Sequence, residues 1–317
     1  MDILDDPYVK WLQRQPDDEE IVKKIEKVLS TRRTYCNHII RKVAKQSQEL
    51  YQELGQWAGD YFVSSAKREF EGAMVDSYMI EDDLLLEERA FLADFFAQLP
   101  EPNLSPDTIV VSPKMDKLVS FLKEMDMPEF SGLVFAKQRS VVITMAKLLS
   151  IHPETRDRYR CAPYIGHSSF FNRKRRVGDM LTVHDQRDTL AEFRDGRKNL
   201  IISTDVLEEG IDINACSLVV CFDKPPNLKS FIQRRGRARR KESNYAIMFA
   251  DSDNSVDVDH WGDLEKMMVE DYQKEERRLA ELRDLEMIDE DVAGALSVES
   301  TGYVSLRRSP HVVPALC

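Results

Sequence analysis

Residues 199–213 read NLIISTDVLEEGIDI, and this stretch decides the fold class of the region around it. It opens with a short apolar run that is followed at once by Ser203, Thr204 and Asp205. An apolar run of this length with a polar end is typical of a buried parallel strand that leads into a loop. Such strand ends are where α/β proteins bind ligands, so we expect a ligand site here.

Further strands and helices are predicted on both sides of this stretch. Downstream, residues 217–222 and 245–249 are apolar runs, and residues 227–232 have the pattern of a helix start. Upstream, residues 132–136 and 160–167 predict strands, residues 138–150 and 185–195 predict helices, and Gly196 is a natural helix terminator. Strands that alternate with helices indicate a doubly wound α/β domain.

Residues 233–240 read QRRGRARR. On a bare helix these arginines would repel one another by roughly a few tenths of a kcal/mol per close pair, so we expect a polyanion against them. A guanidinium group suits phosphate because its planar donor fork engages two oxygens at once. Gly236 would let a backbone approach closely. A solvated basic helix or a localisation signal is the alternative for such a run.

The stretches STDVLEEGID (residues 203–212) and QRRGRARR resemble motifs V and VI of the second RecA-like lobe of superfamily 2 helicases. Their EEGID and Q-x-x-G-R-x-x-R forms resemble the DExH branch that acts on double-stranded RNA. The text between them resembles the Dicer family, fungal Dicer-like proteins in particular. The resemblance, strong over residues 106–250, implies an α/β RecA-like lobe, with helices on both faces of a parallel sheet, preceded by an all-α helical insertion domain.

The resemblance also implies a nucleotide site. In motif VI, the triphosphate of ATP would be faced by Gln233, Gly236, Arg237 and Arg240, with Arg240 the better candidate for the arginine finger. Arg237 and Arg240 are one helical turn apart in sequence, so their side chains could point to one spot. In motif V, Gly210 and Asp212 would lie near the nucleotide ribose.

A second set of residues would bind RNA by the same resemblance. Ser203 and Thr204 match positions that hold an RNA phosphate. The end of the 132–136 strand matches motif IV, so Lys137, Gln138 and Arg139 would contact the RNA backbone. His167 matches a histidine near the RNA. Solvated loop side chains are the alternative for residues 137–139 and for His167, as they are for the basic run at 173–176.

Several helicase and nuclease parts are missing from this sequence. It contains no G-x-x-x-x-G-K-[ST] loop to cradle phosphates, and its acidic run at 289–292 lies in a charged tail with no apolar strand before it. No ribonuclease III carboxylate signature is visible. We therefore expect half of a composite ATP site, with Mg²⁺ held by a first helicase lobe in cis or in trans, and no ATP hydrolysis by this chain in isolation. A non-catalytic double-stranded RNA-binding or regulatory module is the second hypothesis, and a DNA helicase lobe is the third.

Four regions follow one another along the chain. Residues 1–105 show helical periodicity over 18–62, as one long helix or two joined ones, and again over 81–99, so they predict a helical domain. The resemblance makes it an RNA-clamping insertion, whereas the residues themselves also fit a plain packing domain. Prolines then mark a connector to the lobe at 106–250, whose first helix should start at Ser112-Pro113. Residues 251–290 predict a charged helical arm, and residues 291–317 resemble an incomplete start of a dimerisation-type domain, as a truncated gene, a shifted frame or an excised fragment would leave.

Charge and composition agree with a nucleic-acid-binding lobe. The net charge of -11 divides into about -8 for residues 1–105, +7 for 106–250 and -10 for 251–317, so basic charge gathers where the motifs lie. No apolar run is long enough to span a membrane, and the acidic start is unlike a secretory signal. The 5 cysteines form no C-x-x-C pair. We expect an intracellular protein, cytoplasmic or nuclear, with reduced thiols.

Overall fold

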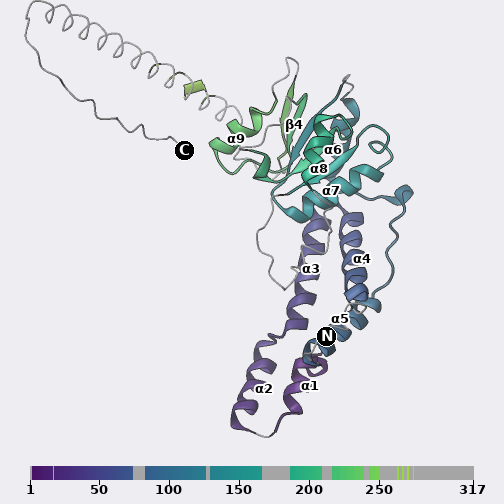
Figure 1. Cartoon of the computed structure of the whole chain (residues 1–317), viewed down its shortest axis with the longest axis vertical. Coiled ribbons are helices and arrows are strands. Elements are labelled where there is room, and N and C mark those ends of the chain that lie inside the picture. The colour runs from purple at the N-terminus through teal and green to yellow at the C-terminus, as the bar shows by residue number, and fades with distance from the viewer. Residues whose placement is uncertain are drawn as a thin grey trace, which may run out of the picture. The chain divides into compact units, whose positions relative to one another are not determined.

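The computed structural model describes residues 2–16, 18–73, 83–125, 129–165, 186–208, 216–238 and 243–249, and a few helical positions between 263 and 274 (Figure 1). The chain divides into two compact units, residues 1–256 and residues 257–317. Among the residues that the structure describes, no helix is long and apolar enough to cross a membrane.

Five parallel strands form the sheet of the lobe. They are β1 (Gly132–Phe135), β2 (Cys161–Tyr164), β3 (Leu200–Ser203), β4 (Leu218–Cys221) and β5 (Asn244–Ile247), in the spatial order β2-β3-β1-β4-β5. The strands predicted from the apolar runs are therefore confirmed. Because β1 is central and the chain crosses it between β3 and β4, the carboxyl ends of these three strands flank a topological switch point.

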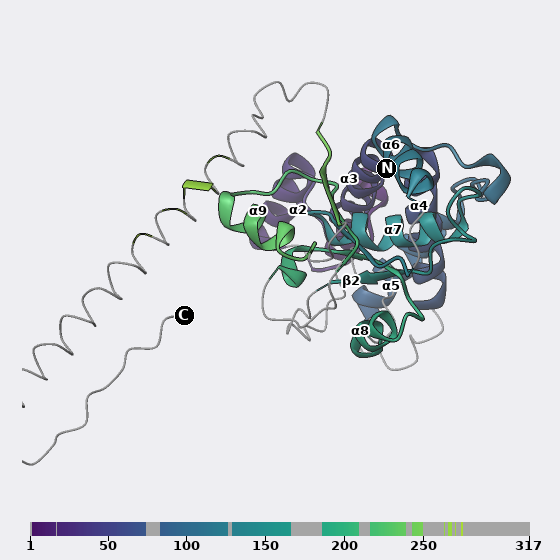
Figure 2. The same ribbon diagram turned by 90° about the horizontal axis from the view of Figure 1, so that it is seen from above.

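Helices cover both faces of this sheet, as predicted. They are α6 (Pro113–Glu124), α7 (Arg139–Ile151), α8 (Gln186–Arg194) and α9 (Leu228–Arg235). Side chains alternate along β1, so that Val134 joins the core under α6 and α7 while Leu133 packs with Phe193 of α8. Helix α8 contacts β2 and α9 contacts β4. In the view from above, α8 and α9 lie apart from each other (Figure 2). The lobe is thus a RecA-like parallel sheet between two helical layers.

The region before the lobe is all-helical. After a 3-10 turn (Ile3–Asp5) it contains α1 (Pro7–Gln13), α2 (Glu19–Thr31), α3 (Tyr35–Leu54), α4 (Gln56–Ala73) and α5 (Asp83–Ala97). The prediction of one or two helices over residues 18–62 was wrong, because the chain breaks twice. Arg32 ends α2 in the left-handed region at φ 51°, and Gly55 separates α3 from α4 at φ 107°. The apolar period continues across both breaks and so hid them.

The helical region and the lobe share one hydrophobic core. Leu50, Leu54 and Phe62 of α3 and α4 belong to the same buried cluster as Leu118 of α6 and Val142 of α7. In Figure 1, α3 and α4 run directly into the base of the lobe under α7. Cys161 also lies in this core, and burial raises the pKa of its thiol to about 12, consistent with a reduced, unreactive side chain. The hydrophobic core is therefore continuous across the predicted domain boundary near residue 105.

Gly55 lies where the two regions meet, and its replacement provides a test of that junction. A Cβ at this position would come within 2.5 Å of the backbone of Val111 and Ser112, at a positive φ that other residues rarely adopt. We expect Gly55→Ala to lower the free energy of unfolding by at least about 2 kcal/mol, because strain and overpacking act together. Gly72→Ala is the matched control. Among the described residues, no atom beyond its chain neighbours and its own helix backbone lies within 4 Å of a Cβ added at Gly72, so chemical denaturation should show unchanged or slightly higher stability. Equal effects of the two variants would contradict the close packing at Gly55.

Candidate functional site

Two of the three segments predicted to bind RNA, residues 137–139 and 203–204, lie at neighbouring strand ends. Phe135 at the end of β1 pairs with Ser203 at the end of β3, and the Ala136 backbone N–H donates to the Ser203 carbonyl at 2.9 Å. Residues 137–139 and 203–204 therefore leave the sheet side by side. We call this side the carboxyl edge; it is where α/β folds bind their ligands.

The loop after β1 presents basic side chains at the start of a helix. Lys137 and Arg139 are exposed and Gln138 is half-buried, with Gln138 at the N-cap of α7. The backbone N–H of Lys137 donates to Asp223 Oδ2 at 2.7 Å, which ties the loop to the end of β4. Two exposed cations and the positive end of a helix at one edge are favourable for phosphate oxygens.

Ser203 and Thr204 are more enclosed than the resemblance implies. Ser203 is fully buried and its hydroxyl donates to the Thr204 carbonyl at 2.9 Å, while Thr204 is 7% exposed. Thr204 precedes the 3-10 turn at Asp205–Leu207. A phosphate contact by Ser203 would require its hydroxyl to leave this bond, so its RNA role stays a prediction.

Arg234 is buried, contrary to the expectation that the arginines of QRRGRARR face a polyanion together. It is 4% exposed, its Nε donates to Glu208 Oε1 at 2.7 Å, and its guanidinium lies over the Phe135 ring at 4.9 Å. Burial opposes its charge, but Cys221 and Glu208 beside it raise the pKa of Arg234 above the ordinary value. The charge of Arg234 is therefore neutralised by Glu208 inside the protein and not by a bound polyanion, whereas Arg235 is exposed.

Motif VI does not continue as a helix through Arg237. Helix α9 ends at Arg235 and Gly236 is its C-cap, so the expected helical spacing of Arg237 and Arg240 does not follow from α9. Gly236 has a negative φ of -62°, which other residues also adopt. Gln233 and Arg237 are both half-buried. Arg237 Nη2 donates to the Glu208 carbonyl oxygen at 2.8 Å, so this predicted catalytic arginine is held against motif V.

Glu208 joins motif V to motif VI, and its role was missed in the sequence. Its Oε1 accepts from Arg234, its Oε2 accepts from Ser230 Oγ at 2.9 Å, and its carbonyl accepts from Arg237. We call these four residues the Glu208 cluster. One signal was available: Arg234 is three residues after the apolar Phe231, so both share the inward face of α9, and a buried cation requires an acidic partner.

Four predicted site residues lie outside the described part of the chain, namely His167, Gly210, Asp212 and Arg240. Their roles stay predictions. The same holds for Mg²⁺: among the described residues, no group of three or more His, Cys, Asp or Glu side chains could hold a metal ion.

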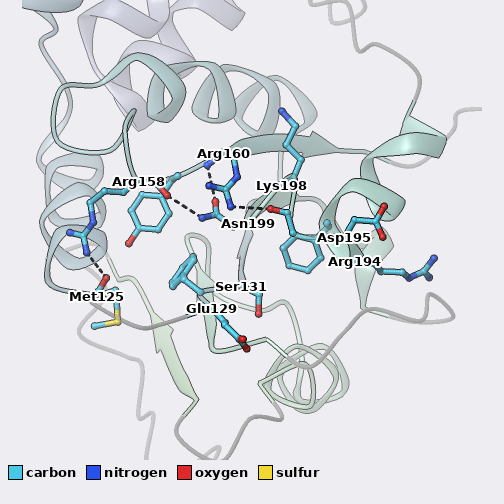
Figure 3. A pocket seen from close by; sticks show the side chains of 13 residues that line it. Met125, Glu129, Ser131, Arg158, Arg160, Arg194, Asp195, Lys198 and Asn199 are labelled. Carbon is cyan, nitrogen blue, oxygen red and sulfur yellow. Dashed lines mark hydrogen bonds between the residues drawn. The ribbon is translucent and has the colours of Figure 1, made fainter.

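A cavity of about 710 Å³ lies at the opposite, amino edge of the sheet (Figure 3). Arg158 and Arg160 line it, but their guanidinium groups donate to backbone carbonyls, Arg158 to those of Lys123 and Met125 and Arg160 to those of Gly196 and Arg197. The Asn199 side chain also bonds to backbone groups: its Oδ1 accepts from the Arg160 N–H and its Nδ2 donates to the Arg158 carbonyl. These polar groups hold the strand starts together, so the cavity is a separate feature from the motif residues.

Comparison with known proteins identifies the lobe. Residues 113–242 match the family described as helicase conserved C-terminal domain. That range contains β1 to β4, α6 to α9 and the Glu208 cluster. This part of the chain is therefore the C-terminal RecA-like lobe of a helicase.

Curated relatives identify the kind of helicase. The chain is 48% identical over 309 residues to Dicer-like protein 2 of Aspergillus fumigatus, covering 96% of this chain and 22% of that relative. It is 50% identical over 308 residues to Dicer-like protein 2-1 of Aspergillus niger, with 95% and 22% covered, and 34% identical over 308 residues to Dicer-like protein 2 of Cryphonectria parasitica, with 95% and 20% covered. The chain thus corresponds to the helicase C-terminal portion of a Dicer-like protein and spans about a fifth of the length of these relatives.

Among solved structures, the Pyrococcus furiosus Hef helicase domain aligns with a TM-score of 0.38 and 19% identity, covering 82% of this chain and 52% of that one. At so low a score the assignment rests on the sequence matches.

Proposed function

We propose that this chain supplies the second half of a composite site for ATP and double-stranded RNA in a Dicer-like endoribonuclease of RNA silencing. In this proposal the loop after β1 and the end of β3 hold the RNA backbone. Motif VI, with Arg240 as arginine finger, completes an ATP site whose Walker A loop and Mg²⁺ come from a first lobe. The helical region would clamp the RNA duplex and residues 251–290 would form a coupling arm, within an intracellular protein.

The observation that carries the proposal is the Glu208 cluster. Glu208 lies in the segment after β3, whose start would contact RNA, and it binds two arginines of the segment that would contact ATP. Both segments are thereby held in one rigid arrangement within the lobe. A displacement of motif VI when the triphosphate is hydrolysed would consequently be transmitted to the RNA-contacting strand ends, as a translocating helicase requires.

A non-catalytic RNA-binding or regulatory role is the second candidate. For the chain in isolation, it is favoured by the absence of a Walker A loop from this sequence, since a P-loop NTPase cradles its β- and γ-phosphates with that loop. In this reading the basic strand ends and the helical region hold duplex RNA without turnover. Both proposed functions predict RNA binding, so they are distinguished by whether ATP is hydrolysed when a first helicase lobe is present.

The proposal is tested by measuring RNA retention and ATP hydrolysis in the same samples. We expect the purified chain to retain long double-stranded RNA, more weakly at higher salt, and to hydrolyse no ATP by itself. Addition of a first helicase lobe, fused or in trans, should restore RNA-stimulated hydrolysis. RNA retention without turnover in the two-lobe protein would favour the non-catalytic role. Preference for duplex DNA would instead support a DNA helicase lobe.

A further inference from the structure

Asp223 connects three segments that lie far apart in the sequence. It follows β4, and its two carboxylate oxygens have different partners: Oδ1 accepts from Lys114 Nζ at 3.0 Å and Oδ2 accepts from the Lys137 backbone N–H at 2.7 Å. Lys114, near the start of α6, also donates to Glu53 Oε2 at 2.8 Å, near the end of α3. A single carboxylate therefore joins the loop after β1 to α6 and, through Lys114, to the helical region.

The surroundings restrict the movement of this carboxylate. The Asp223 side chain is 26% exposed and that of Lys114 is 25% exposed. The Lys114 ammonium lies 4.0 Å from the centre of the Phe222 ring, and the Phe222 backbone N–H donates to the Phe135 carbonyl at 2.8 Å. The position of Asp223 is thus fixed in two ways. The hydrogen bonding between β1 and β4 continues to the preceding residue, Phe222, and the Lys114 ammonium that pairs with Asp223 is itself held over the Phe222 ring.

We propose that Asp223 is a positioning residue for RNA binding, which fixes the loop carrying Lys137 and Arg139 so that their side chains meet successive phosphates. This inference rests on the proposed function, since it requires that the loop contacts RNA. The bond is made to the backbone of Lys137, so it sets the path of the loop and leaves the Lys137 ammonium available at the surface.

The direction in which RNA affinity changes when Asp223 is removed distinguishes a positioning role from simple charge repulsion. A carboxylate near an RNA site repels phosphate, so its removal should tighten binding if charge is all that matters. If Asp223 positions the loop, its removal should weaken binding although a negative charge is lost. The number of phosphate contacts is read from the slope of log affinity against log salt concentration.

The experiment measures the affinity of this chain for blunt double-stranded RNA across a salt series. We expect Asp223→Ala to weaken binding about 3- to 10-fold and to reduce the magnitude of the salt slope by about 1, as the loss of one ordered phosphate contact does. Asp195→Ala is the matched control, because Asp195 is an exposed carboxylate at the amino edge of the sheet. It should leave the slope unchanged and the affinity unchanged or slightly higher. Tighter binding by Asp223→Ala with an unchanged slope would overturn the proposal.

Asp223→Asn provides the test if the alanine variant does not fold. Its side-chain oxygen can still accept from the Lys137 N–H but cannot pair with the Lys114 cation. We expect an affinity between those of the wild type and Asp223→Ala, with the wild-type slope. An increase in affinity equal to that of Asp195→Asn would show that only charge matters and would reject the positioning role.

Lys137→Ala and Arg139→Ala distinguish failure of this inference from failure of the proposed function. If Asp223 acts through the loop, adding Asp223→Ala to a Lys137→Ala, Arg139→Ala variant should weaken RNA binding no further. Additive losses would mean that Asp223 acts elsewhere and would refute the inference. If Lys137→Ala and Arg139→Ala each change neither affinity nor slope, the loop does not contact RNA, and both this inference and the RNA role of the loop are wrong.

Discussion

Replacement of Glu208 with alanine is expected to lower the free energy of unfolding by about 3 to 5 kcal/mol, the usual cost of breaking a buried ion pair by removal of one partner. The side chains of Arg234 and Glu208 are only 5% and 9% exposed, so water cannot take the place of the lost carboxylate. Ser230 Oγ would lose its acceptor as well. Chemical denaturation of the chain, followed by circular dichroism, measures this change.

A matched control separates this effect from the loss of any glutamate. Glu19 pairs with Lys23 on the surface of α2, where the two side chains are 84% and 69% exposed. Exposed pairs of this kind contribute about 0 to 1 kcal/mol, so Glu19→Ala should barely move the denaturation midpoint. Similar losses in the two variants would contradict the buried pairing of Glu208.

A double variant tests the cause of the loss. If an unpaired buried guanidinium accounts for most of the cost, Glu208→Gln combined with Arg234→Met should recover much of the stability, because both buried charges are removed together and the amide oxygen can still accept from Ser230 Oγ. Recovery of folding with loss of RNA-stimulated turnover in a two-lobe protein would show that the cluster connects motifs V and VI and does more than stabilise the lobe.

The parts of the fold that local sequence determines were predicted. Ser112-Pro113 begins α6 as expected, with Ser112 Oγ accepting from the Met115 backbone N–H, and Gly196 takes a positive φ of 72° two residues after the end of α8. The apolar runs gave the strands because a parallel strand is buried on both faces. These features depend on a few neighbouring residues, so a single sequence is enough to predict them.

The connections between the motifs could not be predicted in this way. Asp223 meets Lys137 across 86 positions and Lys114 across 109 positions of sequence, and only the strand order brings them together. The burial of Arg234 likewise depends on where Glu208 lies after β3. Charge repulsion within QRRGRARR predicted that its arginines face a polyanion together, whereas the fold buries Arg234 against Glu208.

Replacement of Arg240 with alanine, in a protein that contains both helicase lobes, is expected to lower RNA-stimulated ATP hydrolysis by about 10³-fold or more, the usual effect of removing an arginine finger. Its guanidinium would neutralise charge that develops only in the transition state, so RNA binding should be largely intact. Steady-state hydrolysis and RNA retention, measured on the same preparation, test both halves of the expectation. Arg235→Ala, the same charge change at an exposed position five residues earlier, is the control and should retain turnover.

Arg237 should behave differently from Arg240 because its guanidinium already has a partner in the lobe. Arg237 Nη2 donates to the carbonyl oxygen of Glu208, and the Arg237 carbonyl accepts from the Cys216 backbone N–H at 3.1 Å. Arg237→Ala should therefore lower stability together with turnover, whereas the finger role of Arg240 predicts a loss of turnover for Arg240→Ala. Denaturation midpoints measured beside the rates separate the two cases. Turnover retained in Arg240→Ala but lost in a well-folded Arg237→Ala would transfer the finger role to Arg237 and would require its bond to Glu208 to open during the reaction.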